Sequence, residues 1–309
     1  MAHNDKDMVY FARKYPFLFG NEGNVEKTWF EEVLKPIFIA NEIGDINVLE
    51  DINNKLQELM GKVPSGVSPD TPEKIWSFTH RTPLKEIKVV IIGKDPYPTK
   101  YQGNPNEFKS DGLAFSTEIS DEDRVKVLRD MPRNRILSLR IFDTIKQQFP
   151  DKEMDSPRSC WTLDSWARQG VLLFNTALTC GEDSGSHLEW WKKITLAIVI
   201  AVRDYVQKND NKEQKLIVHL WGDDAIVNFY SNYFYSDRCK HVDVTLSRHP
   251  SAAYGGRPCI IKNEVFKKTN EKLKEMGKPE IDWSTGPGKH AVQPSDFGSV
   301  ATDETKNNL

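Results

Sequence analysis

Polar side chains follow four short apolar segments of this sequence. They are Asp95 and Tyr97 after segment 87–92, Asn175 after 170–174, Asp223 and Asp224 after Gly222 and segment 215–221, and His249 after 241–246. The two carboxylates of Asp223 and Asp224 are expected only to open the next helix, which leaves Asp95, Tyr97, Asn175 and His249 to share one pocket. An amide can pair with the edge of a polar ring, an imidazole can donate to an oxygen that gains charge, and a carboxylate can face a cationic transition state. Together these side chains suit recognition of a small polar ring combined with electrostatic catalysis.

Each of these residues also has a plainer explanation when it is taken alone. An Asp-Pro pair is commonly a turn, an Asn at a strand end often caps the next helix, and a His before a proline is more often structural than catalytic. Their recurrence at successive segment ends favours a shared site. The sequence contains no HExxH, GxSxG, GxGxxG or GxxxxGK[ST] pattern, which disfavours a zinc protease, a serine triad, a dinucleotide site and a triphosphate site.

The four apolar segments predict buried β-strands, because they are short, end at polar residues and alternate with amphipathic stretches. The predicted helices cover residues 24–38, 46–60, 135–149, 188–206, 223–234 and 260–276. This alternation predicts a three-layer α/β/α fold with a central four-stranded, mainly parallel sheet. Ligands of such folds bind outside the carboxyl ends of the strands, where the polar residues described above would meet.

Composition and charge narrow the class of protein. The chain has 309 residues, of which 38% are hydrophobic and 28% charged, and its net charge is −3, so any contact with nucleic acid must be local. We expect a polar extension over residues 1–23, one domain over 24–285 and a flexible tail over 286–309. Four dispersed cysteines, no secretory leader and no apolar run long enough for a bilayer predict an intracellular protein, nuclear or cytoplasmic, that is not secreted.

Several segments, in order along the chain, resemble the motifs of family 1 uracil-DNA glycosylases, a superfamily that includes poxvirus and large-virus members. The segments are Gly93–Pro98 with Asp111–Ser116, Gly170–Asn175 with Leu178 and Thr179, Ser186 and His187 with Trp190 and Trp191, Leu220–Gly222, His249–Ser251, Thr269 with Asn270, and Ile281–Trp283. The resemblance spans residues 29–283. It implies hydrolysis of the N-glycosidic bond of a flipped-out deoxyuridine in DNA, as in base excision repair.

The resemblance also implies a role for each residue of the base pocket. Asp95 would position the attacking water and stabilise an oxocarbenium-like sugar, and His249 would donate to O2 of the leaving uracil. The uracil-binding residues would be Lys94 through its backbone, Tyr97 excluding a C5-methyl group, Phe115 stacking on the base, and Asn175 reading the N3–H and O4 edge. Neither a metal nor an organic cofactor is expected.

Departures from the family pattern fall mainly on DNA engagement. Lys94 stands where the family usually has Gln, and Pro98 where it usually has His. A charged segment, 120–135, replaces the usual proline-rich loop, and Asp223 replaces a phosphate-contacting serine. The family's inserted leucine is missing, so Tyr254 is the first candidate to fill the gap left by a flipped base and Arg257 the second. The expected DNA-binding residues are Ser186, His187, Gly222, Ser251, Tyr254 and Arg257.

These departures keep an alternative open: a DNA-binding scaffold or replication accessory with the same fold and weak catalysis. A glycosylase for another damaged base is a third reading, against which Tyr97 and Asn175 argue by steric exclusion and by donor–acceptor pattern. The expected partner is uracil-containing DNA, single- or double-stranded, bound by a monomer. A DNA-mimic inhibitor or replication proteins are further candidate partners, and no membrane contact is expected.

Overall fold

A parallel four-stranded sheet lies at the centre of the protein, in the strand order β4-β1-β5-β6. Its strands are β1 (Val89–Gly93), β4 (Val171–Asn175), β5 (Leu216–Trp221) and β6 (Val242–Ser247). The computed structural model describes residues 6–21, 23–44, 47–62, 65–98, 109–118, 137–152, 161–209, 215–234, 241–251, 260 and 263–284. The four strands fall where the sequence predicts them, and the fold class is confirmed.

The strand register brings the strand ends to one edge of the sheet. Gly93 at the end of β1 pairs with Asn175 at the end of β4, and Trp221 at the end of β5 pairs with Ser247 at the end of β6. Every residue of β1, β4 and β5 is buried. Parallel strands covered on both faces need apolar side chains on both faces, which explains their nearly continuous apolar sequence.

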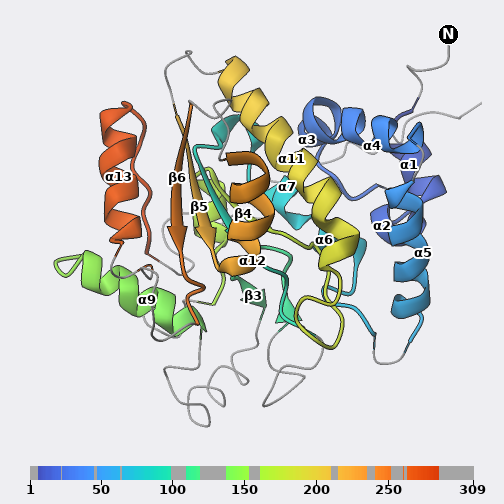
Figure 1. The fold of residues 1–309 in the computed structure, drawn as a ribbon, viewed down its shortest axis with the longest axis horizontal. Helices are drawn as coiled ribbons and strands as arrows, with labels where there is room; N and C mark the ends of the chain where they lie inside the picture. Colours follow the sequence, from blue (N-terminus) through green and yellow to red (C-terminus); the bar gives the residue numbers. More distant parts are fainter. Residues whose placement is uncertain are drawn as a thin grey trace, which may run out of the picture.

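Helices cover both faces of the sheet (Figure 1). On one side lie α9 (Leu137–Gln148) and α13 (Val265–Glu275). On the other side lie α11 (Leu188–Asn209) and α12 (Asp223–Ala225), which continues into the π-helical segment η5 (Ile226–Phe234). In the described part of the chain no helix combines the length and the apolar character that crossing a membrane requires.

Helices from the first third of the chain pack beyond α11 (Figure 1). A continuous helical stretch consists of α3 (Lys27–Trp29), the π-helical η1 (Phe30–Leu34) and α4 (Lys35–Glu42), and it is followed by α5 (Val48–Met60). The side chain of Asn47 caps α5 by accepting from the backbone N–H of Glu50. These elements match the helices predicted over 24–38 and 46–60.

The expectation of a polar extension over residues 1–23 is wrong for residues 8–19. They form two helices, α1 (Met8–Lys14) and α2 (Pro16–Phe19). Phe11, Leu18 and Phe19 are fully buried in the main core, and the Phe19 ring stacks on Trp76 with centroids 5.4 Å apart. Helices of seven and four residues are too short to show a clear period in the sequence.

The remaining short elements have no counterpart in the sequence prediction. They are α6 (Pro72–Ile75), α7 (Ser77–Arg81), the 3₁₀ helix η2 (Leu84–Glu86), β2 (Lys109–Ser110), β3 (Thr117–Glu118) and α10 (Asp164–Arg168). Strands β2 and β3 form an antiparallel pair. The turn between them lies beside the carboxyl ends of the central strands (Figure 1).

Candidate active site

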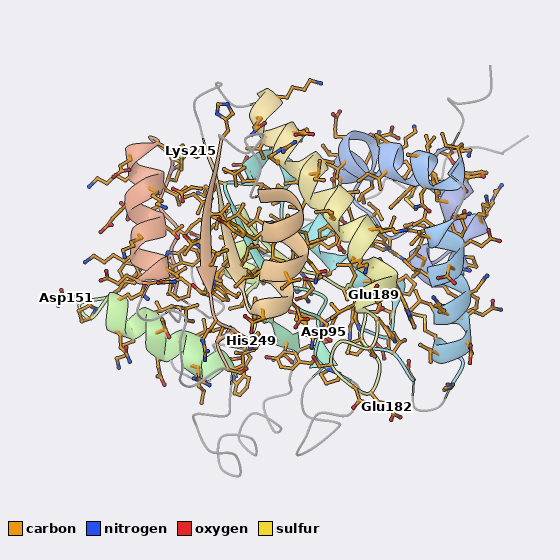
Figure 2. The ribbon with its side chains drawn as sticks, viewed as in Figure 1. Asp95, Asp151, Glu182, Glu189, Lys215 and His249 are labelled. Carbon is orange, nitrogen blue, oxygen red and sulfur yellow. The ribbon has the colours of Figure 1, made fainter. Side chains whose placement is uncertain are left out.

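The predicted site residues gather at the carboxyl edge of the sheet. Figure 2 shows Asp95 and His249 close to each other at this end of the molecule, whereas Lys215, which precedes β5, lies at the opposite end. Asp95 follows β1 and His249 follows β6. The strand order places β5 between these two strands. The His249 side chain lies over the end of β5, where a Cβ atom on Gly222 would be 3.3 Å from the Cβ of His249.

Gly93, Asn175 and Phe115 form the floor of the site. A Cβ atom on Gly93 would lie 2.7 Å from Oδ1 of Asn175 and 2.9 Å from Cζ of Phe115. These distances are shorter than non-bonded contacts allow, so this close arrangement requires glycine at position 93. The end of β4 is fixed by Thr176, whose backbone N–H and hydroxyl both donate to the Gly93 carbonyl, at 3.0 and 2.9 Å.

The amide of Asn175 has an unused hydrogen-bond donor. Asn175 is only 2% exposed, and its Nδ2 has no hydrogen-bond partner among the residues that the structure describes. An unsatisfied buried donor costs about 1–3 kcal/mol. A ligand oxygen placed over the floor of the site would remove that cost, which marks Nδ2 as a binding group.

Phe115 is held in a strained backbone conformation. Its φ is +65°, a region that non-glycine residues rarely adopt and that costs of order 1–3 kcal/mol. The buried carboxylate of Asp111 holds the turn, since it accepts from the hydroxyl of Ser116 at 2.6 Å and from the backbone N–H of Leu113 at 3.1 Å. Arg81, which is partly exposed, donates to the same carboxylate at 2.9 Å, so a partly buried ion pair supports the turn that carries the phenyl ring.

His249 is neutral and carries its proton on Nε2. The backbone N–H of Ser251 donates to Nδ1 at 3.2 Å, and the Ser251 hydroxyl lies 2.6 Å from the same atom. Because a backbone N–H can only donate, Nδ1 is an acceptor. Burial, followed by the nearby charges of Lys94 and Arg140, lowers the pKa of His249 to about 4. The ring therefore has one N–H, on Nε2, available for a ligand.

Asp95 is held by a loop that the sequence analysis did not assign to the site. The thiol of Cys180 donates to Oδ2 at 3.2 Å, and the backbone N–H of Gly185 donates to the same oxygen. The Ser184 hydroxyl donates to Oδ1 at 3.0 Å. Burial and then the charge of Asp95 raise the pKa of the Cys180 thiol to about 12, so this thiol stays protonated and remains a donor.

The other predicted pocket residues, Lys94 and Tyr97, and the predicted DNA contact Gly222 lie at the same edge. The ammonium of Lys94 is 3.4 Å from Oδ2 of Asp224, and the Lys94 carbonyl accepts from the Ala177 backbone N–H at 3.0 Å. Tyr97 is half-buried in the segment that follows Asp95. The backbone N–H of Gly222 donates to the Ser247 carbonyl at 2.9 Å, which extends the pairing of β5 with β6 to the site.

Of the predicted DNA contacts, Ser186 and Ser251 are exposed and His187 is buried. Nδ1 of His187 is 3.0 Å from the Thr179 hydroxyl, and its ring stacks on Trp190 with centroids 3.7 Å apart. Burial, with a smaller effect of Lys55, lowers the pKa of His187 to about 4. These contacts occupy one nitrogen and one face of the ring. Tyr254, Arg257 and the charged segment 120–135 lie outside the described residues.

The site residues missed by sequence reasoning are Cys180, Ser184, Gly185, Asp111 and Arg81. Cys180, Ser184 and Gly185 belong to one loop. The only feature of the sequence that could have placed this loop in the site is that it follows soon after Asn175. Asp111 stood in a quoted motif, but the motif did not reveal its ion pair. Arg81 comes from α7, a helix too short to be predicted.

Comparison with known proteins gives one consistent result. No family model matches the chain. A curated relative from Bacteroides fragilis, uracil-DNA glycosylase 2, is 35% identical over 214 residues, which cover 68% of this chain and 80% of the relative. The uracil-DNA glycosylase of Saccharomyces cerevisiae is 29% identical, over 91% of this chain and 71% of its own length. The crystal structure of mimivirus uracil-DNA glycosylase superposes with a TM-score of 0.61 and 22% identity, over 84% of this chain and 88% of that one, and supports the fold.

Proposed function

The chain belongs to the uracil-DNA glycosylase family, and we propose that Asp95, Tyr97, Phe115, Asn175 and His249 perform its reaction. The protein is a hydrolase that cleaves the N-glycosidic bond of deoxyuridine in DNA, releasing uracil and leaving an abasic site for base excision repair. The base must leave the stack before it can be cleaved, because C1′ and the base edge are inaccessible in a duplex. The proposal concerns how these side chains act on the extruded nucleotide.

The buried, unsatisfied Nδ2 of Asn175 is the observation that supports this proposal most directly. Uracil presents an O4 acceptor beside its N3–H donor. The Nδ2 group would donate to O4 while Oδ1 accepts from N3–H, so one amide reads both groups. Cytosine presents a donor in place of O4 and an acceptor in place of N3–H. The same amide therefore selects uracil over cytosine.

His249 would stabilise the leaving group. When the glycosidic bond breaks, its electron pair moves onto the uracil ring and negative charge develops on O2. The neutral imidazole of His249 would donate its Nε2–H to that oxygen, since within the described part of the chain its hydrogen bonds are made by Nδ1. A preformed donor aimed at developing charge is typically worth about 3 kcal/mol or more.

Asp95 would act on the sugar side of the same bond. Its carboxylate would stabilise the cationic, oxocarbenium-like sugar and accept a hydrogen bond from the attacking water. Phe115 would stack on the base, and its ring already packs against Trp221 with centroids 5.0 Å apart. Tyr97 would exclude thymine by occupying the place of the C5-methyl group, while Lys94 would contribute its backbone to the pocket.

Contacts with DNA outside the pocket would come from residues around the rim of the site. Exposed Ser186 and Ser251 would contact phosphates, and His187 would hold the first of these segments in place through Thr179. The buried Gly222 offers no donor to a phosphate, because its backbone N–H already donates to the Ser247 carbonyl. Tyr254, or failing that Arg257, would fill the gap left by the flipped base. Acidic Asp223 and Asp224 at the same edge would weaken binding to duplex DNA by repelling phosphates.

A gel assay tests the proposal. A uracil-containing oligonucleotide is incubated with the protein in EDTA, and alkali then cuts the strand at abasic sites. The wild type should produce cleavage, and Asp95→Asn should retain the fold and DNA affinity but react at least about 100-fold more slowly. The control is Asp151→Asn, the same change at an exposed position far from the site (Figure 2). Near-normal single-turnover cleavage by Asp95→Asn would refute the role of Asp95.

A further inference from the structure

The two carboxylate oxygens of Asp95 have different surroundings. Oδ2 accepts from the Gly185 backbone N–H and from the Cys180 thiol, whose one proton it shares with the Asp183 carbonyl, also at 3.2 Å. Among the described residues, Oδ1 accepts only from the Ser184 hydroxyl. Each carboxylate oxygen has about two lone pairs for hydrogen bonds. Oδ2 is therefore the more fully engaged oxygen, and Oδ1 is the oxygen with a lone pair left for a water molecule.

The two sides of the Asp95 carboxylate also differ in burial. Cys180 is fully buried, and a backbone bridge with Ser68 fixes it, with N–H···O distances of 2.8 and 2.7 Å. Ser184 is exposed and Asp95 is half-buried. The Oδ1 and Ser184 side of the carboxylate is thus the side that solvent and substrate can reach, and the Cys180 side is an internal support.

A single hydrogen bond to Oδ1 would not orient an attacking water. The attacking water must point a lone pair at C1′, so both of its O–H groups must point away from the sugar. With one acceptor, the water could still rotate about its hydrogen bond to Oδ1. Two acceptors remove this freedom, and orientation of this kind is a large part of enzymatic rate enhancement.

We propose that Ser184 is a catalytic residue that provides the second acceptor for this water. Its single proton is donated to Oδ1, which leaves its own lone pairs available. Ser184 Oγ and Asp95 Oδ1 are 3.0 Å apart, so one water oxygen can lie at hydrogen-bond distance from both, at roughly 2.8 Å. The inference rests on the proposed function, because it requires Asp95 to act on the attacking water.

The step balances without any further reactant. The water oxygen forms a bond to C1′ as the bond from C1′ to N1 of uracil breaks, and the electron pair of that bond leaves with uracil as its anion. One water proton passes to Asp95 Oδ1 and then to solvent. The other stays on the new hydroxyl at C1′, and during attack it is the proton that Ser184 Oγ accepts in a hydrogen bond.

Variants of residue 184 separate this role from simple packing. Single-turnover cleavage of a uracil oligonucleotide is measured with enzyme in excess, and affinity is measured separately on an oligonucleotide with a stable abasic-site analogue. Ser184→Ala should cleave roughly 10- to 100-fold more slowly with unchanged affinity. Ser184→Thr keeps a hydroxyl and should recover most of the rate. The loop control, Asp183→Asn, alters an exposed neighbour and should cleave at the wild-type rate.

A double variant distinguishes failure of this inference from failure of the proposed function. If Ser184 and Asp95 hold one water, Ser184→Ala should slow the Asp95→Asn variant no further. Normal cleavage by Ser184→Ala, or equal losses in the Ala and Thr variants, would overturn the role of Ser184 and leave that of Asp95 standing. Normal cleavage by Asp95→Asn alone would overturn both.

Discussion

The imidazole of His249 lies beside the phenyl ring of Phe115, with centroids 5.6 Å apart and an angle of 45° between the ring planes. This contact joins the residue after β6 to the strained turn between β2 and β3. It also places the imidazole against an apolar surface, where a charged ring would be poorly solvated. The same ring pair thus shapes the pocket and favours the neutral form of its donor.

We predict that His249 stays neutral at pH values well below the ordinary histidine pKa. Its pKa is lowered to about 4, so the folded protein should show a neutral ring from pH 8 to about pH 5, protonated on Nε2. Nitrogen chemical shifts of labelled protein report both the charge and the tautomer, and the His249→Gln variant assigns the signal. A midpoint near 6.5, or a proton on Nδ1, would contradict this account.

Asn175→Asp should abolish the recognition of uracil by hydrogen bonds from residue 175. An ionised carboxylate in this position can accept from N3–H but has no donor for O4, and its second oxygen would face the O4 oxygen with no hydrogen between them. We expect loss of uracil cleavage by at least about 100-fold, with slow release of cytosine, whose exocyclic amine can donate to the new oxygen. Parallel assays on uracil and cytosine oligonucleotides measure both. Intact uracil cleavage would show that another group reads the base edge.

The sequence predicts the sheet well because its signal is local. β1, β4 and β5 are buried on both faces, so each appears as an apolar run, and the polar residues at their ends mark the functional edge. Parallel pairing then determines which ends meet, and this brings Asp95, Asn175 and His249 together although they are far apart in the chain. Helices α5 and α11 are long enough for their apolar period to be visible.

The missed parts depend on contacts between distant segments. Phe11 and Phe19 belong to the core, yet their helices are too short to show a period. Nothing in the residue types reveals that Cys180 and Ser184 contact Asp95, because the loop must fold back across the strand ends to reach it. The support of Phe115 by Arg81 likewise arises only from the packing of α7 against the turn.

Asp111→Asn should impair catalysis by releasing the Phe115 turn. The change removes the charge that faces Arg81 and leaves one oxygen where two serve Leu113, Ser116 and Arg81. We expect a loss of about 1–3 kcal/mol in unfolding free energy and a single-turnover rate roughly 10- to 100-fold lower. Asp164→Asn is the matched control, since the Asp164 carboxylate also lies near Arg81, at 3.6 Å, and its side chain has no hydrogen bond to the turn among the described residues. Equal single-turnover rates in the two variants would show that the ion pair between Asp111 and Arg81 does not position Phe115.

Glu42 should be a major anchor of the N-terminal helices, with an effect on stability that depends on pH. Its carboxylate, 2% exposed, accepts from Lys6 at 2.6 Å and from Lys14 and the Tyr15 hydroxyl at 2.7 Å each. Burial raises the pKa of Glu42, but the hydrogen bonds from Lys14, Lys6 and Tyr15 outweigh it and lower the pKa to about 2. Because the folded pKa lies below the unfolded one, the contribution is complete above about pH 4.5 and declines as the pH falls toward 2.

Glu42→Gln should therefore lower the unfolding free energy by about 2 kcal/mol at pH 7. This is less than the 3–5 kcal/mol typical of a fully buried pair, because the lysines are partly exposed. Urea unfolding at pH 7, 5 and 3 should show the difference from wild type unchanged between pH 7 and 5 and smaller at pH 3. Glu58→Gln, at an exposed position on α5, should have little effect at any of these pH values. A Glu42→Gln difference that stays constant down to pH 3 would show that the carboxylate charge does not anchor α1.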